Sequence, residues 1–393
     1  MYLLLLFLCI TYFIRKELKQ CKAIEKEIFF ITLLIEIVLA IIYRSYLINL
    51  GFEYGLANLD MVCFNSLAED VSHLSFRDGV IAISDHWNFI NANSVQIWGY
   101  RLYIYLLSFF IYRWSFFDAE TSIYLVSIAQ VSIASLSSLI VYNSIKKEIL
   151  VQPVLSLVLI LSAPSIWFGS VRLLRESWMY LCIALIIRFY ITRKKNWELW
   201  IIIPIALLAL FRAYYLVLVV PLCLLLNRQI KLACFVSLVF FSGAIASCLY
   251  TRTPLTTVIG VVLSPNFFNQ IQLMRTSTYE YTLNTGYIPL INFCGAIWNL
   301  FMLTFLVAAL FQTKKNTEMF CCFIIIITLC TIYAIAHGGS TELRHKLFFV
   351  IPYIIILNIA SEGLNKKGLL HFYIVTFISF IFVYSLLYLS LGG

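Results

Sequence analysis

Residues 27–50 read EIFFITLLIEIVLAIIYRSYLINL, an almost wholly apolar run that is long enough to cross a membrane as one helix. Comparable runs recur along the chain of 393 residues, of which 62% are hydrophobic and 12% are charged. A soluble domain is closer to half apolar and a quarter charged. The runs also lack the alternating polarity of transmembrane β-strands. The sequence therefore predicts an all-α fold, a polytopic transmembrane helical bundle.

The net charge and the cysteine content do not indicate nucleic acid or a metal as a partner. The net charge is +9, and basic residues at the cytoplasmic ends of membrane helices account for this excess without nucleic acid. Most of the eleven cysteines lie in apolar runs, and the five histidines are scattered, so we expect no metal and no cofactor. Residues 2–14 are predicted to form a retained helix rather than a signal peptide, because no basic region precedes them.

The placement of lysine predicts the topology. Lysines gather at 16–26, 146–147, 194–195, 231, 314–315 and 366–367. If these segments are cytoplasmic, the spans between them leave and return in pairs. The predicted spans after the first are 122–144, 149–164, 177–192, 198–211, 214–227, 231–249, 290–312, 318–336, 345–363 and 368–391. With the N-terminal helix this gives about 12 helices, and outer segments at 51–121, 165–176, 250–289 and 337–344.

Two stretches leave an alternative open. Residues 198–227 can instead form one tilted helix with Arg212 at its centre, but an arginine at mid-membrane is costly, which favours two short helices. Residues 99–114 carry Arg101 and Arg113 near their ends and are expected to form an interfacial helix on the outer surface. If they crossed, the N-terminal lysines would face outward, against the charge rule.

Arginine gathers on the predicted outer face, where lysine is almost absent. The outer segments contain Arg77, Arg113, Arg172, Arg175, Arg252, Arg275 and Arg344, with Arg101 and Arg212 near the boundary. Arginine binds phosphate oxygens through a planar two-point fork, whereas lysine is a point charge. The pattern favours a site for a phosphorylated ligand, and scattered arginine without a function is the plainer alternative.

Asp60 lies near the start of LDMVCFNSLAED, residues 59–70, in which apolar residues recur at helical spacing. These are Met61, Phe64, Leu67 and Ala68. Asp60 is predicted either to cap this helix or to hold a carboxylate at the mouth of the bundle.

A second candidate group lies in SAPSIWFGSVRLLRESWM, residues 162–179. Pro164 is expected to end one span, and Arg172, Arg175 and Glu176 follow on one short turn. Arg172 and Glu176 are four residues apart, a spacing that allows pairing on a helix face. The group is either a structural ion pair or a phosphate clamp with an acidic side chain beside it.

Further charged residues lie at the ends of apolar runs. In FRAYY, residues 211–215, Arg212 needs a lipid phosphate or a carboxylate such as Asp60 as partner. In HGGSTELRHKLFFVIPY, residues 337–353, Arg344 and His345 stand at the entry to a late span and are candidate substrate-binding residues. Glu36 and Arg44 lie eight residues apart and are expected to pair between helices.

The order of these features resembles the GT-C glycosyltransferases, polytopic enzymes that take sugars from polyprenyl-phosphate or polyprenyl-pyrophosphate carriers. The stretch around Asp60 resembles their first-loop D-x-x-x-aromatic-x-x-x-A pattern, and APSIWFGSVRLLRESW resembles their second outer loop. The stretch from Arg344 resembles a late helix of the same superfamily. The resemblance covers residues 27–250 as topology and 337–363 as a local motif. The composition also resembles that of bacterial O-antigen polymerases.

This resemblance implies a metal-independent, inverting glycosyltransferase in a bacterial inner membrane, with its active site facing the periplasm. Asp60 and Glu176 would be the catalytic residues, and Arg172, Arg175, Arg212, Arg344 and His345 would bind substrate. The implied partners are a polyprenyl-linked sugar donor, a saccharide acceptor and membrane lipids. The enzyme would be either a repeat-unit polymerase or a single-sugar transferase in surface polysaccharide assembly.

Two rival functions stay open, and one domain organisation is predicted. The rivals are a flippase for lipid-linked oligosaccharide and a purely structural membrane subunit. Transporters usually contain repeated halves and polar groups at mid-membrane. The charged residues here gather at one face, which favours the enzyme. Residues 1–393 are predicted to form one membrane domain, with a GT-C-like module at 27–250, a periplasmic loop at 251–289 and C-terminal helices at 290–393.

Overall fold

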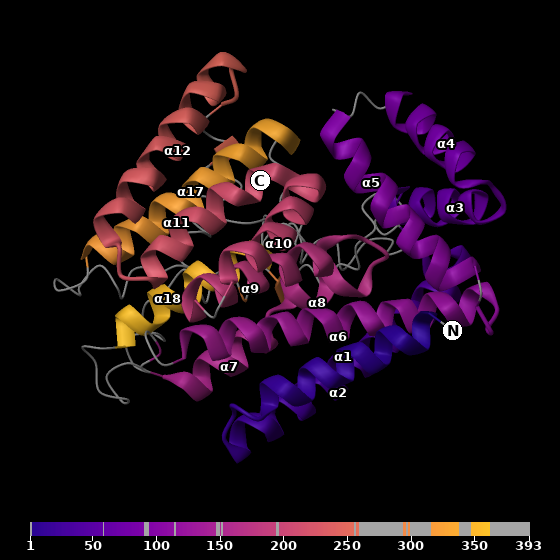
Figure 1. The fold of residues 1–393 in the computed structure, drawn as a ribbon, viewed down its shortest axis with the longest axis horizontal. Helices are drawn as coiled ribbons and strands as arrows, with labels where there is room; N and C mark the ends of the chain where they lie inside the picture. The colour runs from indigo at the N-terminus through magenta and orange to yellow at the C-terminus, as the bar shows by residue number, and fades with distance from the viewer. Residues whose placement is uncertain are drawn as a thin grey trace, which may run out of the picture. The chain divides into compact units, whose positions relative to one another are not determined.

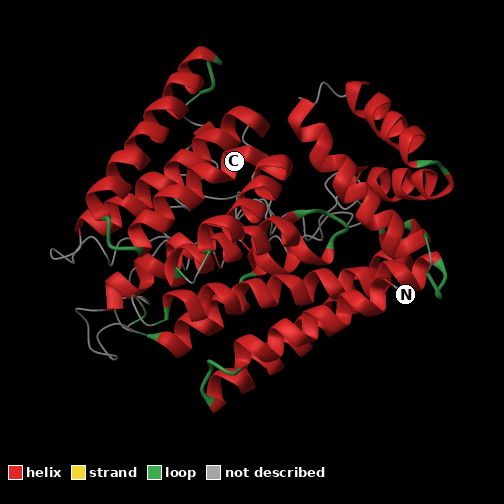
Figure 2. Cartoon of the chain, viewed as in Figure 1, coloured by secondary structure: helices red, strands yellow, loops and turns green. Residues whose placement is uncertain are grey.

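The computed structural model describes residues 2–57, 59–89, 94–113, 115–146, 150, 152–193, 196–254, 257–258, 294–295, 298, 316–337 and 347–361. All regular elements in these ranges are helical, as Figure 2 shows. The α-helices, labelled in Figure 1 where there is room, are α1 Tyr2–Leu18, α2 Ala23–Asn49, α3 Leu59–His73, α4 Phe76–Phe89, α5 Ser94–Leu107, α6 Ala119–Ile145, α7 Pro153–Leu161, α8 Pro164–Val171, α9 Glu176–Thr192, α10 Trp197–Arg212, α11 Leu216–Leu226, α12 Ile230–Tyr250, α17 Asn316–His337 and α18 Val350–Ser361. The shorter elements are η1 Glu53–Gly55, the π-helix η2 Ser108–Tyr112 and η3 Ala213–Tyr215.

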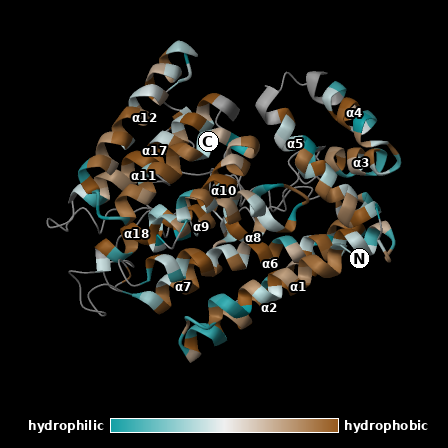
Figure 3. Cartoon of the chain, viewed as in Figure 1, coloured by the Kyte–Doolittle hydropathy of each residue, from teal (hydrophilic) through white to brown (hydrophobic). Residues whose placement is uncertain are grey.

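Six helical stretches in the described ranges are long and apolar enough to cross a membrane. They are Ala23–Asn49, Ala119–Ile145, Pro153–Val171, Trp197–Leu226, Ile230–Tyr250 and Thr317–Ile335. Figure 3 shows how hydrophobic residues dominate α11, α12 and α17. The described ranges are all-α, as predicted, and the six candidate spans agree with the prediction of a multi-pass membrane protein. The count of about 12 helices and the GT-C architecture stay predictions.

The chain divides into two compact units that interleave along the sequence. The first comprises residues 1–143, 166–215 and 279–287, and the second comprises 144–165, 216–278 and 288–393. Each unit is therefore assembled from segments that are distant in sequence. The candidate residues before position 216 all belong to the first unit.

In the first unit, α6 is largely buried, whereas α2 keeps an exposed face. Within the candidate span of α6, 83% of the residues are buried, against 28% in α2. Phe29 and Leu47 of α2 are fully buried, whereas Phe30 and Leu34 of the same helix are more than half exposed. An exposed apolar face on a long helix suits contact with lipid chains.

Polar side chains of α6 bind buried charged residues of α2. Ser135 Oγ donates a hydrogen bond to Glu36, and Ser127 Oγ accepts two from the Arg44 guanidinium at 3.1 and 2.9 Å. Arg44 also donates to the backbone carbonyl of Gly55 at 2.7 Å. Glu36 and Arg44 thus bind different serines of α6, and Arg44 binds backbone carbonyls as well. The predicted pairing of α2 with another helix is present, with serines as partners.

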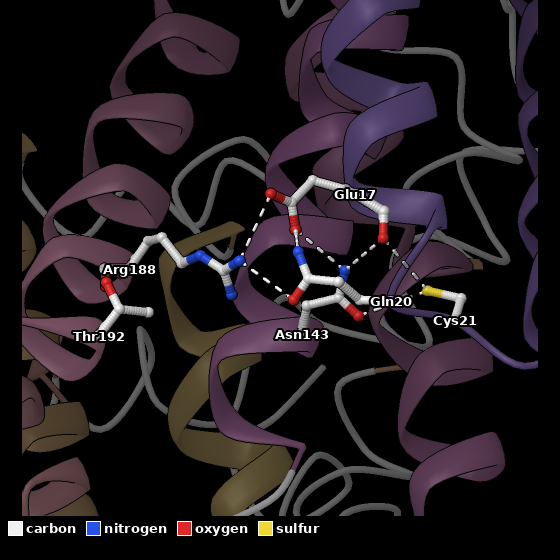
Figure 4. Close-up of polar contacts among 6 residues, drawn as sticks. All are labelled: Glu17, Gln20, Cys21, Asn143, Arg188 and Thr192. Carbon is white, nitrogen blue, oxygen red and sulfur yellow. Dashed lines mark hydrogen bonds and ion pairs between the residues drawn. The ribbon is translucent and has the colours of Figure 1, made fainter. Parts of the chain in front are cut away.

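A polar cluster joins α1 to α6 and α9, as Figure 4 shows. Asn143 Nδ2 of α6 donates to the Glu17 side chain at 3.0 Å and to its backbone carbonyl at 3.1 Å. Arg188 of α9 lies 3.7 Å from the same carboxylate and donates to Gln20 Oε1 at 3.1 Å. Cys21 Sγ completes the cluster by contacting Asn143 Oδ1 at 3.4 Å. The N-terminal helix is therefore bound to the first unit by specific polar contacts.

The predicted outer segment after α2 is largely helical. Met61, Phe64, Leu67 and Ala68 of α3 are all buried, which confirms the helical spacing read from the sequence. Arg113 then donates to the carbonyls of Val71, Ser72 and Leu74, and so satisfies the C-terminal end of α3.

The predicted interfacial helix at 99–114 falls within α5 and η2. Tyr103, Ile104 and Leu107 are buried, whereas Trp98 is 54% exposed. This helix therefore packs most of its length against its own unit. Its place at the membrane surface stays a prediction.

Two boundary predictions are wrong. Pro164 does not end a span: it is the first residue of α8, a position where proline loses no helical hydrogen bond, and Pro153–Val171 forms one candidate span. The two short helices expected at 198–227 are joined by η3 without an intervening loop. Trp197–Leu226 is therefore one candidate span of 30 residues, which corresponds to the single-helix alternative.

In the second unit, α12 and α17 run parallel. Arg228, just before α12, pairs with Glu318 at 3.4 Å, and Ser237 lies 3.4 Å from the thiol of Cys321. These contacts advance in the same direction along both helices, as is expected of parallel axes. The result agrees with the topology predicted from lysine placement, in which both segments leave the same side of the membrane.

Another contact in the second unit joins α7 to α18. The Asn358 side chain accepts a hydrogen bond from the Gln152 backbone N–H at 3.1 Å and donates to Ser156 Oγ at 3.1 Å. A buried amide on α18 thereby satisfies polar groups at the first turn of α7.

We expect oxidation to join α12 to α17 through Cys234 and Cys321, whose thiols hydrogen-bond each other. Treatment of membranes with copper phenanthroline should produce a disulfide-linked peptide pair that mass spectrometry detects after digestion. A Cys234→Ser variant should lose the linked pair. Linkage of Cys234 to Cys330, later on α17, in place of Cys321 would contradict the parallel register.

Candidate functional site

Three predicted site residues meet where α8 gives way to α9. Residues 172–175 are non-helical and join the two helices. Arg172, Arg175 and Glu176 are all at least 98% buried there. Arg172 and Glu176 were expected to share a helix face, but they do not, because α9 begins only at Glu176. A short buried turn therefore presents two guanidinium groups and one carboxylate.

Arg175 lies on an aromatic ring and keeps part of its guanidinium free. Its Cζ atom is 3.9 Å from the centre of the Tyr100 ring of α5. Among the described residues its Nη1 atom has no hydrogen-bond partner. Burial lowers the pKa of Arg175, and the charge of Arg212 lowers it further, while Tyr100 and Glu176 act in the opposite direction. A buried cation with an unused donor is suited to bind an anion.

Arg212 lies at the end of α10 in the same neighbourhood. It is 8% exposed and donates a hydrogen bond to the Tyr214 hydroxyl at 2.9 Å. Its charge interacts with Glu176 and with Tyr100. The structure thus brings Arg175, Glu176 and Arg212 together. The partner predicted for Arg212 was a lipid phosphate or an acidic residue, and the interacting acidic residue is Glu176.

Glu176 is the first residue of α9, where the N-terminal end of the helix dipole favours a carboxylate. Its Oε2 atom has no hydrogen-bond partner within the described part of the chain. It interacts electrostatically with Arg175 and with Tyr103. The carboxylate keeps an acceptor oxygen available beside the arginines.

Arg172 also lies near residues of α8 and α2. It is fully buried, with its Cζ atom 5.2 Å from the centre of the Phe168 ring. Its charge interacts with Arg44 and Tyr43 of α2. The turn of residues 172–175, here named the arginine turn, therefore places Arg172 near the buried residues Tyr43 and Arg44 of α2.

The backbone of the turn is held by buried side chains from α2 and α6. Arg44 Nη2 donates to the Val171 carbonyl at 3.0 Å. The Gln130 amide, in the orientation that satisfies both of its polar atoms, donates to the carbonyls of Ser170 at 3.0 Å and Arg172 at 2.6 Å. The carbonyls of Ser170 and Val171 belong to the last turn of α8, where the helix supplies no further N–H groups.

Asp60 lies in the first turn of α3, one position inside the helix rather than at the cap. Its carboxylate, together with burial, raises the pKa of the Cys63 thiol to about 11, with burial the larger cause. Phe64, one turn later on the same face, packs against Tyr100 with ring centres 5.7 Å apart. Because the Arg175 guanidinium lies on the same Tyr100 ring, α3 contacts a residue that also contacts Arg175.

Several site residues escaped the sequence analysis, and two predicted ones cannot be placed. Arg344 and His345 lie outside the described residues. Tyr100, Tyr103 and Gln130 contribute to the site and were not predicted. Tyr100 and Tyr103 share a helix face at i, i+3 spacing, which is the only signal that could have pointed to them.

The described ranges contain no group of three or more His, Cys, Asp or Glu side chains arranged to hold a metal ion. The groups available for chemistry at the site are buried guanidinium donors, tyrosines and one carboxylate. No family model, curated protein or solved structure matches this chain. Its function must be argued from these residues.

Proposed function

We propose that the protein is a membrane glycosyltransferase that transfers sugar from a polyprenyl-phosphate or polyprenyl-pyrophosphate carrier. The observation that supports this most is the buried pair of Arg175 and Arg212, with one donor of Arg175 unused. Buried charge is costly unless it is paired, so such a site favours an anionic ligand. In a multi-pass membrane protein, the phosphate of a lipid carrier is an anion that such a site would meet.

The same residues supply the electrostatic part of the reaction. As the bond between the anomeric carbon and the carrier phosphate breaks, negative charge grows on the phosphate oxygen. Arg172, Arg175 and Arg212 would stabilise that charge in a setting where water does not screen it. Arg344 and His345 belong to the same proposal through the resemblance.

Acceptor activation is assigned to the acidic residues. Asp60 would remove the proton from the acceptor hydroxyl, whose oxygen then attacks the anomeric carbon in a single inverting displacement. Glu176 would orient the acceptor or the arginines. This assignment is supported by the contact of Phe64 with Tyr100, which brings the helix of Asp60 against the residue that carries Arg175.

One observation favours a flippase of lipid-linked oligosaccharide as the second candidate. Glu36 lies near the middle of α2 and is 6% exposed, with Ser135 as its side-chain partner. Ionisable residues at mid-membrane are typical of transport pathways. The enzyme remains the better candidate because the free donor and acceptor atoms gather at the arginine turn.

The test is deletion of the gene in its native host, followed by gel analysis of the surface polysaccharide. Collapse of the ladder to one repeat unit would indicate a polymerase, and altered spacing would indicate a single-sugar transferase. Complementation with Asp60→Asn should fail although the protein is made. Loss of all repeat units, with lipid-linked intermediates on the cytoplasmic side, would support the flippase and contradict the enzyme. An unchanged ladder would contradict a role in that polysaccharide.

A further inference from the structure

Gln130 of α6 occupies a central place beneath the arginine turn. Its amide nitrogen donates to the carbonyls of Ser170 and Arg172, and its Oε1 atom accepts from the Tyr103 hydroxyl at 2.7 Å. The side chain is 1% exposed. All of its amide hydrogens and its carbonyl oxygen are therefore used within the protein. We call Gln130 the brace of the turn, because it binds the backbone of the turn and has no amide hydrogen left for a ligand.

The brace acts at the point where the turn changes direction. The Arg172 carbonyl accepts both the Gln130 amide and the Leu174 backbone N–H, the latter at 2.7 Å. Arg175 follows at once, and its own carbonyl accepts the Met179 N–H at 3.0 Å to begin α9. The path of the backbone from 172 to 175 is thus set between Gln130 and the first turn of α9.

Helix α5 contacts both Gln130 and Arg175. Tyr103 binds Gln130, and Tyr100, one turn earlier, lies beneath the Arg175 guanidinium at 3.9 Å. Helix α5 therefore contacts both Gln130, which binds the backbone of the turn, and the guanidinium group of Arg175. A shift of Gln130 would move the backbone of the turn relative to Tyr100.

We propose that Gln130 is a positioning residue, which aims the free Nη1 atom of Arg175 at the anionic ligand. The inference rests on the proposed function for the identity of that ligand as a lipid phosphate. It assigns Gln130 no contact with the ligand. Its effect on binding must therefore pass through Arg175.

The experiment measures binding of farnesyl phosphate to the full chain in detergent, in wild type and in Gln130→Leu, each with and without Arg175→Met. Gln130→Leu should weaken binding about tenfold in the wild-type background, because it removes the hydrogen bonds that fix the turn. In the Arg175→Met background the same change should have less than about a twofold effect. Equal losses in both backgrounds would indicate a general structural role and overturn the inference.

The matched control is Ser137→Ala, on the same helix. Ser137 is fully buried, and within the described ranges its hydroxyl donates to the Ile133 carbonyl one turn back at 2.7 Å. This variant should bind farnesyl phosphate as wild type does. A loss equal to that of Gln130→Leu would count against a specific role for Gln130.

A second measurement separates this inference from the proposed function. Hydrogen–deuterium exchange of peptides covering residues 170–176 should be faster in Gln130→Leu and unchanged in Ser137→Ala. If wild type does not bind farnesyl phosphate but exchange still rises, the proposed ligand is wrong and the positioning of the turn stands. If wild type binds and Gln130→Leu changes neither binding nor exchange, the positioning role is wrong and the proposed function stands.

Discussion

Replacement of Arg175 with methionine is expected to reduce sugar transfer about 100-fold or more, the usual cost of removing one preorganised donor from a site where negative charge develops. Methionine keeps much of the side-chain volume over the Tyr100 ring while removing the charge and the free Nη1 donor. The measurement is the rate at which lipid-linked sugar is consumed by membranes that contain equal amounts of each variant.

Lysine at this position should restore part of the activity. Arg175→Lys keeps the positive charge, but it cannot offer a planar two-point contact or stack equally well on the tyrosine. We expect a loss of about tenfold, between wild type and methionine.

Arg193 provides the matched control for this prediction. It also lies over aromatic rings, with its Cζ atom 5.3 Å from the Tyr190 ring centre, but it is exposed and follows the far end of α9. Arg193→Met should leave transfer unchanged. Full activity in Arg175→Met would remove the arginine turn from the proposed mechanism.

The second large effect is expected from the substitution Gly99→Ala. Gly99 of α5 packs directly on the backbone of α10, and a methyl group there would overlap the Leu210 carbonyl oxygen and come within 3.1 Å of Phe211 Cα. Backbone atoms cannot rotate away as a side chain can, so the two helices must separate. Overpacking of this kind costs about 1–3 kcal/mol.

Separation of α5 from α10 would also disturb the site. Tyr100 follows Gly99 on α5, and Arg212 lies just beyond Leu210 on α10. The expected result is a lower thermal unfolding midpoint in detergent together with loss of transfer. Gly243→Ala on α12 is the control, because a Cβ atom there meets nothing within 4 Å. An unaffected Gly99→Ala protein would show that α5 and α10 do not approach so closely.

The sequence predicted well what depends on composition and local periodicity. The run around Glu36 was identified as a span, and the spacing of Met61 and Phe64 predicted the buried face of α3. These features depend on neighbours along one helix, which the sequence contains directly. The wrong boundary at Pro164 arose because proline suits the first turn of a helix as well as the end of one.

The site was predicted only in part because its geometry is tertiary. Arg175, Glu176 and Arg212 were chosen as charged residues beside apolar runs, and the structure brings them together. The contributions of Gln130 and Tyr100 could not be predicted. Gln130 lies in the serine-rich helix α6, where no motif in the neighbouring sequence distinguishes it. Its partners Ser170 and Arg172 are distant in sequence.

Arg44 has consequences for how the chain is made. Two of its hydrogen-bond partners are 83 and 127 residues later in the sequence, at Ser127 and Val171. At a synthesis rate of about 5–20 residues per second, α2 is present for several seconds before either exists. Of the hydrogen-bond partners among the described residues, the Gly55 carbonyl, eleven residues on, is the one already present during that time. The isoleucines and leucines of α2 must therefore retain the nascent helix in the bilayer until α6 and α8 arrive.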